Sequence, residues 1–158
     1  MATVEFVDTS VLVEVLDVPG RNGNRARIMR DLKRKQREKI QLVLPVATII
    51  ETGNHITHIA EGWARRRCAQ TFAGMLELCS QGEAPWVLYA ASWDGEMLTA
   101  LCEGARTQMT LVDHAVGQML GSGDLSILAE RDRYRRRVSK GTVVRVWTEE
   151  EHMNQWAS

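Results

Sequence analysis

Hydrophobic positions recur along the chain with two alternating periods, one typical of strands and the other typical of helices. Residues 3–7 are rich in β-branched and aromatic side chains, which predicts a strand, and residues 8–10 (Asp-Thr-Ser) are types that favour the start of a helix. The alternation continues to the end of the chain. It predicts further strands at 42–44, 86–90, 125–129 and 142–147, and helices at 11–16, 22–39, 45–59, 63–80, 93–102 and 110–120.

Strands that alternate with helices predict a parallel sheet, because parallel neighbours need a crossover connection that is usually a helix. We therefore expect a three-layer α/β/α domain with a central, mainly parallel sheet over residues 1–148, followed by a polar tail at 149–158. The chain has 158 residues, of which 44% are hydrophobic and 25% charged. These values suit one globular domain and exclude a disordered or fibrous chain.

Charge is balanced overall but segregated along the sequence. Twenty basic and twenty acidic residues cancel, so any nucleic-acid-binding face must come from local clustering. Nine basic residues against two acidic ones lie between 21 and 39, and six against one lie between 131 and 140. Either run is also compatible with a solvated helix face or with docking of an acidic protein.

Cysteine usage and the N-terminal residues bear on the compartment. The three cysteines form no CxxC motif and cannot all pair within the chain, as is typical of reduced thiols in the cytoplasm. The N-terminal residues include acidic side chains, whereas the start of an export signal has basic ones. No apolar run reaches the ~18 residues of a membrane span. We expect a cytoplasmic protein that does not contact a membrane.

Acidic residues follow or flank several of the predicted elements. Asp8 comes directly after the first strand, Glu51 and Asp113 lie on helices that can begin at the same edge of the sheet, and Asp132 follows the strand predicted at 125–129. Four carboxylates in one place repel one another unless a divalent cation neutralises them. Because oxygen ligands alone suit Mg²⁺ or Mn²⁺, the sequence predicts a site for one of these ions.

Four stretches in this order resemble the motifs of the PIN-domain nucleases, the fold of the VapC-type toxin ribonucleases. VEFVDTSVLVEVL is similar to the first motif, VATIIETGNHI to the second, MTLVDHAVGQML to the third, and LAERDRYRR to the fourth, where a strand ends in a Thr-x-Asp pattern. Glu130 stands where the family usually has Thr or Ser. Asp132 fits the acidic position if the preceding turn is one residue longer, and otherwise Arg131 falls there.

The resemblance covers nearly the whole chain and implies a metal-dependent endoribonuclease, the toxin of a toxin–antitoxin pair. It implies RNA as substrate, a cognate antitoxin as partner and a homodimer. By the same resemblance, Ser10 orients the attacking water or the phosphate, and the ligands of Mg²⁺ or Mn²⁺ are Asp8, Glu51, Asp113 and Asp132. The basic residues expected to contact RNA phosphates are Lys33, Arg34, Lys35, Arg37, Arg131 and Arg133.

Other interpretations remain open. A non-catalytic PIN-like module would bind RNA or a protein, and metal-dependent cleavage separates it from the nuclease. Glu51, His55 and His58 lie at helical steps of four and three, which permits a transition-metal site, and Asp8 with Lys140 permits a phosphoacceptor domain. Aromatic side chains carry a large apolar area, so three tryptophans are expected in the core or at an interface: Trp63, Trp86 and Trp93.

Overall fold

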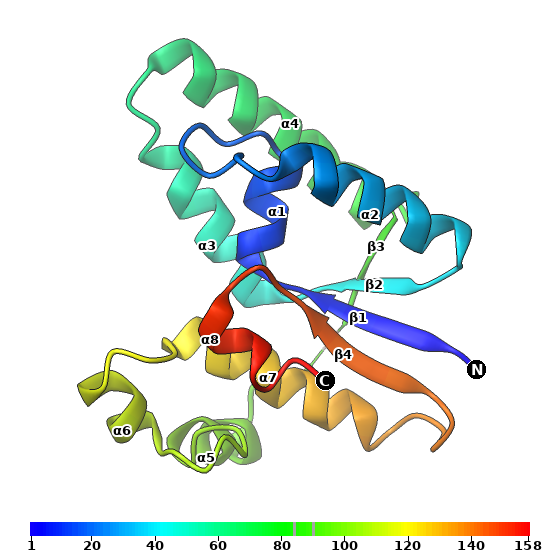
Figure 1. The fold of residues 1–158 in the computed structure, drawn as a ribbon, viewed down its shortest axis with the longest axis vertical. Helices are drawn as coiled ribbons and strands as arrows, with labels where there is room; N and C mark the ends of the chain where they lie inside the picture. The colour runs from blue at the N-terminus through cyan, green and yellow to red at the C-terminus, as the bar shows by residue number, and fades with distance from the viewer. Residues whose placement is uncertain (84, 90) are drawn as a thin grey trace.

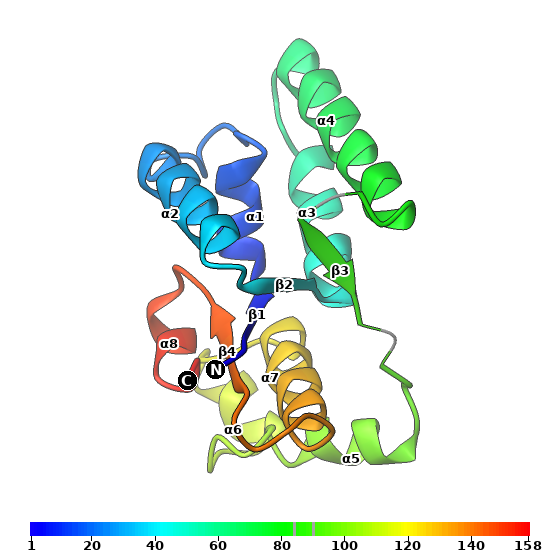
Figure 2. The ribbon, with the colours of Figure 1, turned by 90° about the vertical axis from the view of Figure 1, so that its right-hand side faces the viewer.

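The computed structural model describes residues 1–83, 85–89 and 91–158, which form one parallel sheet with helices on both faces (Figure 1, Figure 2). Its strands are β1 (Thr3–Val7), β2 (Gln41–Leu44), β3 (Trp86–Leu88) and β4 (Val143–Trp147), and their order across the sheet is β3-β2-β1-β4. The helices are α1 (Thr9–Val15), α2 (Arg25–Arg37), α3 (Val46–Thr57), α4 (Gly62–Ser80), α5 (Gly95–Cys102), α6 (Leu111–Val116), α7 (Ser122–Arg135) and α8 (Glu151–Asn154). The predicted α/β/α architecture is therefore confirmed.

Each face of the sheet buries its own hydrophobic cluster, because successive side chains of a strand point to opposite faces. Val7 and Leu44 pack with the helices α1 to α4 on one face. Phe6, Val43 and Val146 pack on the other face, which α5 to α8 cover (Figure 1). Within the described ranges, no helix is both long and apolar enough to cross a membrane.

The stretch 125–129 is a correction to the sequence prediction, because it is helical rather than extended. It lies inside α7, which packs against α3, α5 and β4, so all five residues are buried. A short apolar run that is buried on every side looks the same in a strand and in a helix. The helix predicted at 110–120 is also shorter and ends at Val116. The strand prediction at 86–90 holds for Trp86–Leu88, and Ala90 lies outside the described residues.

Residues 149–158 belong to the domain, although the sequence predicted a separate polar tail. They include α8, whose Met153 is fully buried in the cluster under β4. Further along, the backbone N–H of Val146 donates to the carbonyl of Ala157 at 2.7 Å. The segment therefore covers part of the β4 edge.

A buried ionic cluster joins α2 to the sheet. Glu5 in β1 is 1% exposed, and its two carboxylate oxygens accept hydrogen bonds from Lys35 Nζ at 2.5 Å and from Arg145 Nε at 2.7 Å. Lys35 Nζ also lies 4.6 Å from the centre of the Trp147 ring, within the range of a cation–π interaction. Lys35 was expected to contact RNA, but it is buried and engaged by the sheet, so this prediction is wrong.

Candidate functional site

A polar pocket of about 190 Å³ opens where β1 and β4 end. Four carboxylates from four different elements line it. Asp8 directly follows β1, Glu51 lies in the second turn of α3, Asp124 lies in the first turn of α7, and Glu150 follows β4. This is the edge at which parallel strands and the starts of their helices converge, the usual position of a binding site in such a sheet.

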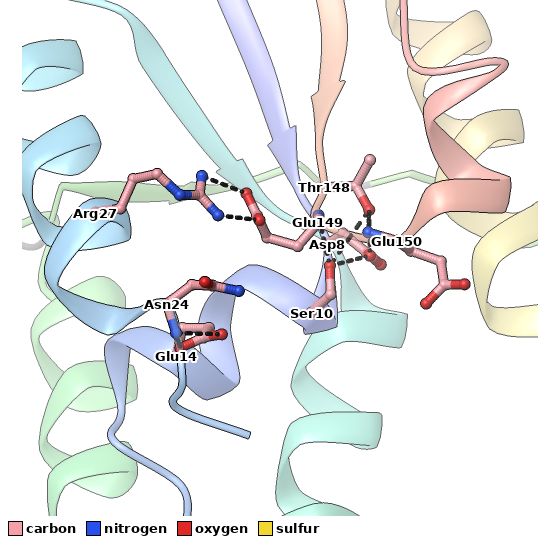
Figure 3. A network of polar contacts seen from close by, with 8 residues as sticks. All are labelled: Asp8, Ser10, Glu14, Asn24, Arg27, Thr148, Glu149 and Glu150. Carbon is pink, nitrogen blue, oxygen red and sulfur yellow. Dashed lines mark hydrogen bonds and ion pairs between the residues drawn. The ribbon is translucent and has the colours of Figure 1, made fainter. Parts of the chain in front are cut away.

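The Asp8 carboxylate is fixed by two hydroxyl groups. Its Oδ2 accepts hydrogen bonds from Ser10 Oγ at 2.7 Å and from Thr148 Oγ1 at 2.8 Å (Figure 3). Asp8 is 2% exposed, and no hydrogen-bond partner for its buried Oδ1 exists among the described residues. A buried carboxylate oxygen normally has a partner, so Oδ1 is the atom of this pocket that most clearly lacks one.

The same two hydroxyls connect the start of α1 to the end of β4. Ser10 Oγ accepts the backbone N–H of Glu149 at 2.9 Å, and Thr148 Oγ1 accepts that of Glu150 at 2.9 Å. Because the single hydroxyl proton of Ser10 is donated to Asp8, Ser10 positions the carboxylate. Its expected contact with water would have to use the remaining oxygen lone pair, and a phosphate oxygen, which has no proton to donate, is not bound in this way.

Of the three consecutive glutamates after Thr148, only Glu150 lines the pocket. The Glu149 carboxylate instead pairs with the Arg27 guanidinium of α2, at 3.1 Å and 2.5 Å (Figure 3). This ion pair ties the loop after β4 to α2.

Glu51 is held between Thr9 and Gly123. Its Oε2 accepts a hydrogen bond from Thr9 Oγ1 at 3.1 Å, and a Cβ atom placed on Gly123 would lie only 1.6 Å from Oε1. The glycine therefore leaves the space that the Glu51 carboxylate occupies. Burial raises the pKa of Glu51 and the charge of Asp8 adds to the effect, while the Thr9 hydrogen bond opposes it.

Asp124 has the most strongly perturbed pKa of the pocket. Burial, followed by the charges of Asp8 and Glu51, raises it from an ordinary 3.8 to about 7, and Glu150 contributes in the same direction. The backbone N–H of Gly121 donates to Asp124 Oδ2 at 3.3 Å and partly offsets the rise. The carboxylates of the pocket therefore share one electrostatic environment, in which full ionisation is unfavourable without a cation.

We expect the metal-free protein to lose thermal stability as the pH rises from about 4 to about 7. Because the folded-state pKa of Asp124 is raised, the folded state binds more protons than the unfolded state in this window, and the stabilisation present at low pH is lost as the pH passes about 7. Glu130, whose pKa burial raises to about 7, acts in the same direction. Thermal unfolding at several pH values checks this, and Asp124→Asn should flatten the profile in part. Identical profiles for wild type and Asp124→Asn would contradict it.

The structure brings Asp8 and Glu51 together as predicted, but it does not bring Asp113 or Asp132 to this pocket. Asp113 is exposed and caps α6, where its carboxylate accepts the Thr110 backbone N–H at 3.1 Å. That hydrogen bond lowers the pKa of Asp113. Asp132 lies two turns beyond Asp124 on α7 and pairs with Arg131 Nε at 2.8 Å.

Sequence reasoning missed Asp124 and Glu150, although a signal for each was present. Ser-Gly-Asp at 122–124 has the composition of a helix start, with an acid in the first turn. The Thr-x-acid pattern, which the resemblance placed after the strand predicted at 125–129, is also present at Thr148 and Glu150 after β4. Because 125–129 was predicted to be a strand, the fourth acidic position was sought in the residues that follow it, and neither Asp124 nor Glu150 was considered.

Two basic side chains also line the pocket, Arg21 and His55. A turn positions Arg21: its backbone N–H donates to Val18 O at 2.9 Å, and Gly20 adopts φ of +80°, which a glycine tolerates well. Burial, then the charges of Arg21 and His58, lowers the pKa of His55. His55 and Arg21 thus stand beside the carboxylates.

Arg131 and Arg133 are corrections to the predicted RNA contacts, since both are mostly buried. Arg131 Nη1 donates to the carbonyl of Trp156 at 2.6 Å, and Arg133 Nη2 donates to Asp94 Oδ2 at 2.7 Å. Their guanidinium groups hold the C-terminal segment and the start of α5. Both guanidinium groups are therefore engaged within the fold.

Three of the α2 residues expected to contact RNA are exposed, as an electrostatic surface requires: Lys33, Arg34 and Arg37. The Arg34 guanidinium forms ion pairs with the Asp31 carboxylate at 3.7 Å and with the Glu38 carboxylate at 3.0 Å. Exposed ion pairs of this kind are weak, so Arg34 can exchange these partners for a phosphate.

The alternative chemistries find less support in the geometry. Lys140 precedes β4 and therefore lies at the opposite edge of the parallel sheet from Asp8, which a phosphoacceptor site would not allow. His58 Nδ1 is 2.7 Å from the Asn54 carbonyl oxygen. Across the described ranges, no three His, Cys, Asp or Glu side chains form a ready-made metal-binding group, and this holds for the four carboxylates of the pocket as well as for Glu51 with its two histidines.

The pocket nevertheless offers the ligand chemistry of a hard cation. Its four acidic side chains supply oxygen only, and the unpartnered Oδ1 of Asp8 is one such donor. An ion here would have to retain water ligands, as Mg²⁺ commonly does. Comparison of the chain with protein-family models and with curated proteins finds no match.

Proposed function

We propose that this protein is a metal-dependent endoribonuclease of the PIN type and the toxin of a toxin–antitoxin pair. The Asp8 carboxylate carries the proposal: it is buried, two hydroxyls fix one of its oxygens, and the other has no partner among the described residues. Leaving such an oxygen unpaired is unfavourable, and a divalent cation offsets that cost. The antitoxin partner and the homodimer are proposed from the sequence resemblance alone.

The residues of the pocket have separable roles in this proposal. Asp8 binds Mg²⁺ or Mn²⁺ directly, and Glu51, Asp124 and Glu150 bind it directly or through water. Such an ion, when bound, polarises the scissile phosphate and lowers the pKa of the attacking water.

Arg21 binds a phosphate oxygen at the rim of the pocket, where it offsets the negative charge of the approaching backbone. Among the described side chains, Arg21 forms no ion pair within 4.0 Å, so its guanidinium is available for this contact.

The test is cleavage of a structured RNA with Mg²⁺ or Mn²⁺ by wild type, Asp124→Asn and Asp113→Asn. We expect wild type to cleave only with metal. Asp124→Asn should lose at least about 100-fold in rate, because changes even in the groups that orient metal ligands reach 10- to 100-fold. Asp113→Asn is the matched control and should stay within a few-fold of wild type, since Asp113 caps α6 outside the pocket.

Each outcome of this experiment is informative. Loss of cleavage in Asp113→Asn but not in Asp124→Asn would contradict the site assignment. Binding of RNA by wild type without cleavage in either metal would favour the non-catalytic PIN-like module instead.

Gly123→Ala is expected to separate activity from stability. The added Cβ would meet Glu51 Oε1 at 1.6 Å, so the flexible Glu51 side chain has to swing away from Thr9, at small cost to the fold. We expect cleavage to fall about 10- to 100-fold, while the free energy of unfolding stays within about 1 kcal/mol of wild type.

The matched control for Gly123→Ala is Gly74→Ala in α4, where a Cβ meets nothing within 4 Å. Cleavage assays and thermal unfolding of both variants provide the comparison. Equal activity of Gly123→Ala and Gly74→Ala would show that the Glu51 position is unimportant for cleavage.

A further inference from the structure

A second, mostly apolar hollow of about 260 Å³ adjoins the carboxylate pocket, and Glu51 lines both. Val46 and Ile50 from α3, Leu101 from α5 and Trp93 just before α5 form its apolar wall. Gly123, which makes room for the Glu51 carboxylate, lies at the junction between the two cavities. We refer to this cavity as the apolar hollow.

The apolar side chains around the hollow are unusually accessible. Val46 is 44% exposed, Ile50 58% and Trp93 50%. Val46 and Ile50 are four residues apart on α3 and therefore lie on the same side of that helix. A cluster of exposed large apolar groups beside a polar pocket is characteristic of a ligand-binding surface.

Trp93 lies near Glu130 of α7. Glu130 is 2% exposed, and its hydrogen bond with Trp93 opposes the rise in its pKa that burial causes. Its Oε2 has no hydrogen-bond partner among the described residues. Because indole donates only through its N–H, that group is the one through which Trp93 acts on the Glu130 carboxyl.

We propose that the apolar hollow binds an unpaired base of the RNA substrate, stacked on Trp93, next to the nucleotide whose phosphate lies in the carboxylate pocket. This inference rests on the proposed function. Glu51 lines both cavities, so one ligand can occupy both at once. A nucleic acid that places a phosphate at the carboxylates extends its adjoining nucleoside across Gly123 into the hollow. A flat base with apolar faces matches an indole ring and three aliphatic side chains.

The proposal predicts a substrate class. A base can stack on Trp93 only when it is outside a duplex, so the nucleotide beside the cleaved bond has to be single-stranded. Loops, bulges and unpaired ends would then be cleaved, and continuous duplex would be resistant. Stacking tolerates any base, so the hollow selects for an unpaired nucleotide more than for a particular sequence.

Binding of a labelled five-nucleotide RNA, measured with Ca²⁺ in place of Mg²⁺ and with the RNA verified intact, tests the proposal. We expect Trp93→Ala to weaken binding by about 5- to 100-fold, the range measured for loss of one base–aromatic stack, and Trp93→Phe to retain most of the affinity. The matched control is Trp63→Ala, because Trp63 is 70% exposed at the start of α4 and lines neither cavity. It should bind as wild type does.

An RNA with an abasic site in place of one base completes the design. With the abasic site at the stacked position, the RNA should bind wild type as weakly as the intact RNA binds Trp93→Ala. The Trp93→Ala variant should bind the abasic RNA no more weakly than it binds the intact RNA.

If wild type cleaves RNA but Trp93→Ala binds the intact RNA normally, the inference is overturned and the proposed function stands. If wild type neither binds nor cleaves RNA, both are overturned. Circular dichroism of Trp93→Ala and Trp93→Phe distinguishes lost stacking from lost folding.

Discussion

Asp8→Asn is expected to abolish metal-dependent cleavage, by at least about 100-fold, and to leave the metal-free protein as stable as wild type or slightly more stable. The amide oxygen of Asn can still accept the hydroxyls of Ser10 and Thr148, which bond only one carboxylate oxygen of Asp8. The variant removes a negative charge that raises the pKa values of Glu51 and Asp124. Repulsion in the folded state therefore falls as metal affinity is lost.

Three measurements on Asp8→Asn check this expectation. Cleavage assays give the loss of activity, calorimetric titration with Mn²⁺ gives the loss of metal binding, and thermal unfolding without metal gives the change in stability. Asp132→Asn is the control, because its carboxylate pairs with Arg131 outside the pocket. Strong destabilisation of metal-free Asp8→Asn would mean that Asp8 serves the fold rather than a cation.

Lys35→Met is expected to have the largest effect on stability, a loss of about 3 kcal/mol, at the low end for breaking a buried ion pair. The substitution removes a cation from Glu5, which is 1% exposed, and also removes the contact with the Trp147 ring. Arg145 still pairs with Glu5 at 2.7 Å and limits the loss. At roughly 2–4 °C per kcal/mol, the thermal midpoint should fall by about 6–12 °C.

Lys33→Met provides the comparison on the same helix. Lys33 is exposed, so its replacement should change stability by no more than about 0.5 kcal/mol. The double variant Glu5→Gln with Lys35→Met should recover part of the loss, since it also removes the buried Glu5 charge, which Arg145 alone compensates after Lys35 is lost. Additive losses in the double variant would show that the two residues do not interact.

Part of the site could be predicted because it depends on local sequence. Asp8 follows a strand whose β-branched and aromatic residues identify it, and Glu51 lies in a helix that begins after Pro45. Both positions are determined by elements whose ends the sequence marks clearly. Asp124 and Glu150 depend instead on whether 125–129 is a strand or a helix, and a run of five residues with four apolar side chains does not decide between them.

The roles of the basic residues could not be predicted for a different reason. Lys33 and Lys35 are two positions apart on one helix, yet one is exposed and the other is covered by the sheet. What distinguishes Lys35 from Lys33 is its ion-pair partner, Glu5. Glu5 interrupts the apolar strand β1, and because its carboxylate is buried it needs a cation from a neighbouring element. Such pairing joins residues far apart in the sequence, so periodicity does not reveal it.

The hydroxyl bridge between the two ends of the domain has a consequence for the order in which the protein becomes competent. Asp8 and Thr148, which it joins, are 140 positions apart in the chain. The carboxylate pocket is therefore complete only after β4 has paired with β1, because before that pairing it lacks Glu150 and the hydroxyl of Thr148 that fixes Asp8. The proposed cleavage would thus require β4 to be in place, however well the first half of the sheet has already formed.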